Sequence, residues 1–63
     1  MNKFITINKS DGERMAIRKD LVTFVTERNS EEEPTKVWTK GEYEDEFYTC
    51  CNTFEEVLAK LEE

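Results

Sequence analysis

Three stretches of the chain have the pattern of β-strands that are apolar on both faces, namely residues 3–8, 21–27 and 46–51. Successive side chains of a strand point to opposite faces, so Ile5 opposes Phe4 in the first stretch, and Phe24 opposes Val25 in the second. Only one short helical pattern is available to cover these strands. We therefore expect the helix to cover one face of the sheet and the other face to meet something outside this fold.

A capping box marks the start of that helix. Thr53 can accept hydrogen bonds from the first free amides, while Glu56 reaches back to the amide of Thr53. Apolar side chains then recur with helical spacing on one stripe, namely Phe54, Val57, Leu58 and Leu61. A helix of about ten residues does not persist alone in water, so it must dock on the sheet.

Turn signals separate the strand segments. Asp11-Gly12 predicts a hairpin turn because glycine accepts a positive φ. Pro34 and the acidic residues before it indicate a loop over residues 28–35, and Gly41 marks a second connection. The predicted strands are residues 3–8, 13–17, 21–27, 35–40 and 46–51. The sequence thus predicts an α+β fold, mostly β: one domain over residues 1–63 with a four- to five-stranded antiparallel meander, one short C-terminal helix and self-association.

The chain is too short to gain much stability from its core. A domain of 63 residues buries only about 60% of its unfolded surface. Cys50 and Cys51 are adjacent, so a disulfide between them would be strained, and we expect Cys51 to be buried as a small apolar side chain. There are no histidines and no spaced cysteine pairs, so no metal site and no cofactor are predicted. Oligomerisation is the remaining source of stability.

The sequence shows no signal peptide and no membrane span. Two unpaired thiols are typical of a reducing compartment. We therefore expect a cytoplasmic protein without a membrane partner, in a bacterial cytoplasm or, if a phage encodes the chain, in the host cytoplasm.

Acidic side chains dominate the second half of the chain. The net charge is −6; residues 1–28 hold six basic and four acidic side chains, and residues 29–63 hold three basic and eleven acidic ones. This balance argues against direct nucleic-acid binding, which needs cations to replace phosphate counterions. The acidic half suits a basic partner surface or simply favours solubility. Its candidate contact residues are Glu31, Glu32, Glu33, Glu42, Glu44, Asp45 and Glu46.

The order of elements resembles the FlbD-type family of small bacterial and phage proteins. The matching stretches are residues 4–8 with the Asp11-Gly12 turn, residues 17–25, and TFEEVLAKL at residues 53–61. The resemblance implies a small, β-rich, helix-closed and self-associating fold without catalytic residues. It also raises a regulatory role beside flagellar genes as a further possibility.

Aromatic and basic side chains supply the candidate contacts. Phe24, Trp38 and Tyr48 are the expected centre of an interface, because aromatic residues are enriched at such surfaces. Arg14 and Arg18, together with Trp38, are candidates for a phosphate or nucleotide pocket between subunits; the alternative is a solvated hairpin face. No glycine-rich loop joins a strand to a helix, so the nucleotide-binding motifs are absent.

No catalytic function is predicted. Glutamate, serine and cysteine side chains are present, but no histidine is available to act with them. The leading interpretation is a non-enzymatic interaction module that acts as a homodimer or higher oligomer. The alternative is a phage-encoded inhibitor of a bacterial defence or transcription system. Such an inhibitor either blocks a basic host surface with its acidic half or sequesters a small nucleotide signal.

Overall fold

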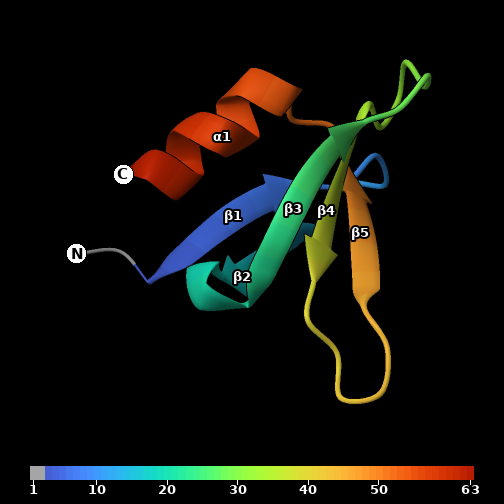
Figure 1. Ribbon diagram of the computed structural model, residues 1–63. Helices are drawn as coiled ribbons and strands as arrows, with labels where there is room; N and C mark the ends of the chain where they lie inside the picture. The colour runs from blue at the N-terminus through green and yellow to red at the C-terminus, as the bar shows by residue number, and fades with distance from the viewer. Residues whose placement is uncertain (1–2) are drawn as a thin grey trace.

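A computed structural model describes residues 3–63 as five strands and one α-helix (Figure 1). The elements are β1 (Phe4–Asn8), β2 (Arg14–Arg18), β3 (Val22–Glu27), β4 (Thr35–Thr39), β5 (Glu46–Cys50) and α1 (Phe54–Glu62). The predicted mostly antiparallel β-structure with a C-terminal helix is therefore confirmed. Gly12, with φ of 92°, forms the predicted turn between β1 and β2.

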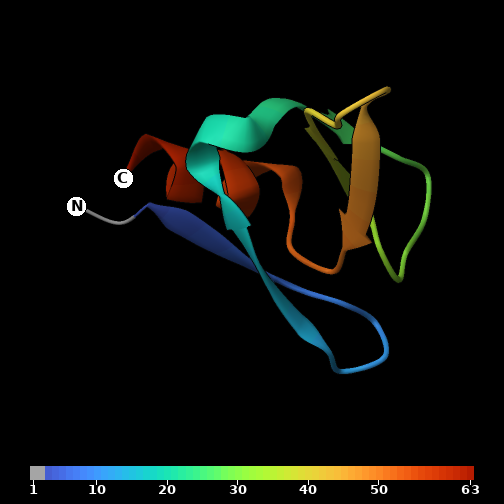
Figure 2. The ribbon, with the colours of Figure 1, turned by 90° about the horizontal axis from the view of Figure 1, so that it is seen from below.

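The strands form two sheets instead of one continuous meander. β1 and β2 make an antiparallel hairpin, and β3, β4 and β5 make a separate antiparallel sheet in that order. The expectation of a single meander is wrong at residues Lys19–Leu21, which form a 3₁₀ turn between β2 and β3. This turn carries the chain out of the hairpin instead of back along β2. Figure 2 shows the hairpin and the three-stranded sheet diverging, with α1 beside them.

The hydrophobic core lies where the two sheets and the helix meet. It contains residues from the hairpin, the three-stranded sheet and α1, namely Ile5, Ile7, Ile17, Val37, Cys50 and Val57. The hairpin therefore shares the covering of the sheet's inner face with the helix. The premise that one short helix must cover the sheet unaided is wrong, because the second sheet supplies part of the cover.

Hydrogen bonds join the two sheets at one corner, where the end of β1 meets the end of β5. The Cys51 amide donates to the Asn8 carbonyl at 2.7 Å. The Asn8 amide donates to Asn52 Oδ1 at 2.8 Å, and Thr35 Oγ1 donates to the Asn52 carbonyl at 2.6 Å. Asn52 and Thr35 are both buried, and unpaired polar groups at buried positions are costly. We call this set the corner network.

The burial of the two cysteines is the reverse of the expectation that Cys51 is buried. Cys50 is fully buried, whereas Cys51 is exposed. In β5, Cys50 pairs with Thr35 on the inner face, and Cys51 lies one residue past the strand. Burial raises the pKa of the Cys50 thiol. Cys50, not Cys51, is therefore the small side chain that fills the core.

The C-terminal helix begins with the predicted capping box. The Glu56 amide donates to Thr53 Oγ1 at 3.1 Å, and the Thr53 amide donates to Glu56 Oε1 at 3.2 Å. These bonds with Thr53 lower the pKa of the Glu56 carboxyl. Val57 is the fully buried helix residue. Within residues 3–63, no helix is long and apolar enough to cross a membrane.

A β-bulge interrupts the alternation of β3. Val22 pairs with Thr39 and Phe24 with Trp38, so Thr23 is an extra residue on its strand. As a result Val22 and Val25 both pack against the core, while Phe24 lies on the other face. In a strand with strict alternation Val22 and Phe24 would share a face, and the extra residue Thr23 is the reason that they do not.

Candidate interaction face

Three aromatic rings lie side by side on the outer face of the β3–β4–β5 sheet. Phe24 pairs with Trp38, and Trp38 pairs with Phe47, one from each strand. The Phe24 and Trp38 ring centroids are 5.1 Å apart and stacked, and those of Trp38 and Phe47 are 5.0 Å apart. Phe24 is 48% exposed and Phe47 49% exposed. We call these three side chains the aromatic face.

Neighbouring polar side chains hold the central ring in place. Trp38 Nε1 donates to Thr26 Oγ1 on β3 at 3.2 Å, so the indole N–H is satisfied within the chain. Lys36 Nζ lies 4.2 Å from the Phe47 ring centroid and 5.2 Å from that of Trp38. Such cation–π contacts favour a fixed lysine position. The aromatic face is therefore pre-ordered, with one cation beside its centre.

Tyr48 does not belong to the aromatic face, so the prediction that it lies beside Phe24 and Trp38 is wrong. Tyr48 pairs with Val37, a core residue, and packs against the core. Its hydroxyl donates to Glu46 Oε2 at 3.4 Å. Phe47, one residue earlier, takes the expected place of Tyr48. A shift of one residue reverses every side chain of a strand, and the loop between β4 and β5 sets this register.

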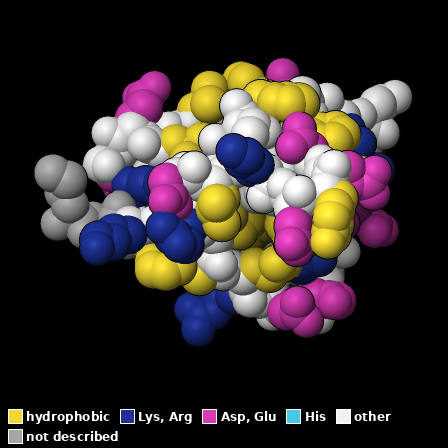
Figure 3. All heavy atoms as spheres, turned by 60° about the horizontal axis from the view of Figure 1, so that its bottom comes forward, with side chains coloured by type: hydrophobic (Ala, Val, Ile, Leu, Met, Phe, Trp, Pro, Cys, Tyr) yellow, Lys and Arg dark blue, Asp and Glu magenta, His cyan; other side chains and the backbone are white. Residues whose placement is uncertain are grey.

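Exposed acidic side chains lie in the loops at both ends of β4. Residues 28–34 connect β3 to β4 and carry Glu31 and Glu32, and residues 40–45 connect β4 to β5 and carry Glu42, Glu44 and Asp45. We call these the acidic loops. Figure 1 shows them at opposite ends of the three-stranded sheet, and in Figure 3 acidic side chains gather mainly on the side of the molecule where that sheet lies.

The acidic loop after β4 depends on its glycine. A Cβ added at Gly41 would overlap the carbonyl oxygen of Glu44.

The last residue predicted for the acidic surface, Glu46, lies on β5 opposite Thr39, a buried residue. Glu46 therefore belongs to the inner face of the sheet, beyond the loop.

Glu33 differs from the other acidic candidates because its carboxylate contacts three residues from other parts of the chain. Its carboxylate accepts from Thr49 Oγ1 at 2.6 Å and from the Ser10 amide at 3.0 Å, and it lies 3.8 Å from Lys9 Nζ. The hydrogen bonds with Thr49 and Ser10, with help from Lys9, lower the pKa of Glu33 to about 2. Glu33 thus ties the β3–β4 connection to the hairpin turn and to β5.

Replacing Glu33 with glutamine is expected to flatten the acid dependence of stability. A lowered carboxyl pKa stabilises the folded state above the ordinary pKa of 4.5, and this contribution is lost as the pH falls towards about 2. Thermal unfolding between about pH 5 and pH 2.5 should show a smaller decrease for Glu33→Gln than for the parent chain. Glu32→Gln, a neighbouring exposed position, is the control. Equal slopes for Glu33→Gln and the parent would contradict this role.

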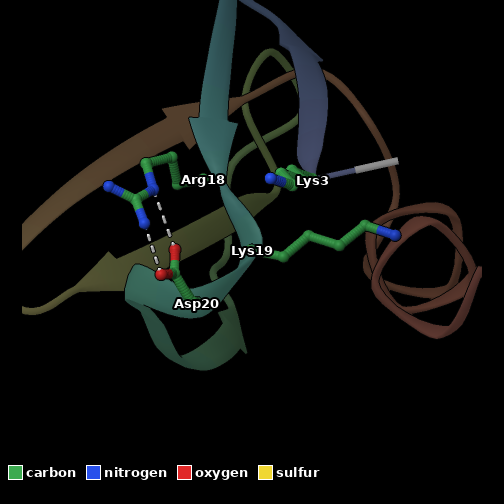
Figure 4. Close-up of a pocket in the computed structure, with 4 residues that line it drawn as sticks. All are labelled: Lys3, Arg18, Lys19 and Asp20. Carbon is green, nitrogen blue, oxygen red and sulfur yellow. Dashed lines mark hydrogen bonds and ion pairs between the residues drawn. The ribbon is translucent and has the colours of Figure 1, made fainter. Parts of the chain in front are cut away.

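The predicted phosphate-binding residues do not come together in one chain. Arg14 and Arg18 are exposed on β2 of the hairpin, whereas Trp38 lies on the outer face of the other sheet. Arg18 is already paired, with Nε and Nη2 donating to the Asp20 carboxylate at 3.1 and 2.6 Å. Figure 4 shows this pair in a pocket of about 390 Å³ that Lys3 and Lys19 also line. A site with Arg14, Arg18 and Trp38 needs two copies of the chain.

Comparisons with known proteins add no family to this geometry. No protein-family model, no curated protein and no solved structure matches the chain. The resemblance to the FlbD-type family therefore stays a prediction. Within residues 3–63, no group of three or more histidine, cysteine, aspartate or glutamate residues is placed to hold a metal ion.

Proposed function

We propose that this chain is a non-enzymatic interaction module whose binding surface is the aromatic face. One observation carries the proposal: the rings of Phe24, Trp38 and Phe47 form a contiguous ladder, and two of them are almost half exposed. The hairpin and α1 lie against the inner side of the sheet (Figure 2). Water contact with apolar surface costs about 25 cal/mol per Å², so covering these rings with a partner is favourable.

In the free protein, the occupant of the aromatic face is a second copy of the chain. A domain this small needs a source of stability besides its core, and association is one such source. A disulfide does not supply it here, because both cysteines are free thiols. A two-fold symmetric pair brings each aromatic face onto the other. This arrangement buries all three rings of both copies in one contact.

The acidic loops make this dimer sensitive to salt. In this dimer the β3–β4–β5 sheets of the two copies stack face to face with their strands aligned, either parallel or antiparallel. In both cases an acidic loop of one copy lies next to an acidic loop of the other at each end of the stacked sheets. Like charges repel over about 10 Å at 0.1 M salt and over longer distances at lower ionic strength. Added salt should therefore strengthen the dimer.

Sedimentation velocity tests the dimer directly. The dimer fraction should rise between about 20 and 500 mM NaCl, and Phe47→Ser should weaken association by about tenfold or more, because aromatic anchors dominate interface energy. Phe4→Ser is the matched control, since Phe4 is 46% exposed but lies on β1 of the hairpin, outside the aromatic face and the acidic loops. A monomer at every salt concentration, or equal effects of the two substitutions, would contradict the dimer. Circular dichroism verifies the fold of each variant.

The acidic loops favour a second candidate function through the same face. The acidic loops would attract a protein with a basic surface, whereas they would repel the acidic loops of a second copy. Under this alternative the module is a phage-encoded inhibitor of a bacterial defence or transcription system, and it blocks a basic host surface with its acidic half. A decrease of partner binding with rising salt would support it, and salt-independent binding would oppose it.

A further inference from the structure

We propose that the partner of the aromatic face is an extended protein segment with an apolar centre and a basic residue or pair of residues at each end. The proposal rests on the function proposed above and adds the chemical class of the partner. It follows from the arrangement of charged and aromatic groups on the sheet: the aromatic ladder crosses the three strands between the two acidic loops, nearer the loop after β4, because Trp38 is the fourth of the five β4 residues.

The spacing of the acidic loops sets the length of the segment. β4 has five residues, and a strand rises about 3.3 Å per residue, so the loops are separated by roughly 16 Å. An extended partner of about five residues spans the same distance. Its basic ends would then reach Glu31 and Glu32 at one end and Glu42 and Glu44 at the other.

The centre of the face selects against a cation in the middle of the segment. Lys36 Nζ already lies over the Phe47 ring and close to Trp38. A second cation at this position would be repelled, whereas an apolar side chain would pack on the rings. The aromatic face and the acidic loops therefore recognise the order of the residues in the segment as well as their composition.

The same rings cannot hold a partner segment and a second copy of the chain together. Binding of the segment should therefore dissociate the dimer. The two associations should also respond to salt in opposite directions, because the dimer brings like charges together and the segment brings opposite charges together.

Two peptides of identical composition test the order of charges. The probe is KRGLFLGRK, with five residues between two basic pairs, and the control is GLKRFRKLG, with the basic residues in the centre. Binding can be followed by the fluorescence of Trp38, the only tryptophan, because neither peptide contains one. The probe should bind about tenfold more tightly than the control in about 50 mM NaCl and weaken as salt rises.

Two charge-reversed variants of the protein locate the contact. Glu42→Lys with Glu44→Lys should weaken probe binding by about tenfold, since it reverses one acidic loop. Glu55→Lys with Glu62→Lys makes the same change in net charge at exposed positions of α1 and should leave probe binding within about twofold. Circular dichroism verifies that both variants are folded.

The outcomes separate the two proposals. Equal binding of the two peptides, or equal effects of the two charge-reversed variants, would overturn the extended basic segment while the dimer result stands. If Phe47→Ser changes neither dimerisation nor probe binding, the aromatic face itself is not the binding surface, and both proposals fall. Tighter probe binding that depends on Phe47 and on the loop after β4 supports the inference.

Discussion

Replacing Ile7 with alanine is expected to leave most of the protein unfolded at 37 °C. Ile7 is 0% exposed and lies in the core between the hairpin, the three-stranded sheet and α1. Truncation of a buried isoleucine costs about 2–5 kcal/mol, and a core in a domain of this size rarely supplies more than about 3–5 kcal/mol. Urea unfolding followed by circular dichroism measures the loss.

The matched control for Ile7 is its neighbour Thr6, which is exposed on the opposite face of β1. Thr6→Ala removes a similar number of atoms without leaving a cavity, so the change should stay below about 1 kcal/mol, the span of strand propensities. A loss at Ile7 no larger than the loss at Thr6 would mean that the hairpin does not pack on the core as described.

Replacing Asn52 with alanine is expected to destabilise the protein by about 1–3 kcal/mol, the cost of leaving a buried polar group without its partner. Asn52 Oδ1 accepts from the Asn8 amide, and Asn52 is 8% exposed. In a domain with so small a margin, this loss would separate β1 from β5 in a large fraction of molecules. Urea unfolding measures the total effect, and hydrogen exchange at the Asn8 amide reports the local one.

Asn52→Asp distinguishes the hydrogen bond from the volume of the side chain. Aspartate keeps an oxygen at the position of Oδ1 and differs little in size. The Asn8 amide should therefore remain more protected in Asn52→Asp than in Asn52→Ala. Equal exchange rates in the two variants would show that the corner network does not depend on this oxygen.

The sequence predicts the elements of this fold well where the signal is local. The capping box at Thr53 and the helical stripe after it identify α1, and the structure shows both. The Asp11-Gly12 turn is also found, and β1 and β2 lie within one residue of their predicted ranges. Each of these features depends on residues that are close together in the chain, so local propensity suffices.

The features that escaped prediction depend on distant pairing. The division into two sheets is the exception, because it follows from a short local element, the 3₁₀ turn at Lys19–Leu21, which has no strong sequence signature. The register of β5 decides that Phe47, and not Tyr48, joins Trp38. The role of Glu33 depends on Ser10 and Thr49 from other elements. Composition groups Glu33 with its acidic neighbours, and only the fold separates it from them.

Thr23 gives β3 an unusual tolerance to length change. Deleting a residue from a regular strand turns every side chain on one side of the deletion inside out. Removing Thr23 would instead leave Val22 inward, Phe24 outward and Val25 inward, because Thr23 is the surplus residue of its strand. A related chain one residue shorter at this point can therefore retain both the buried valines and the outward ring.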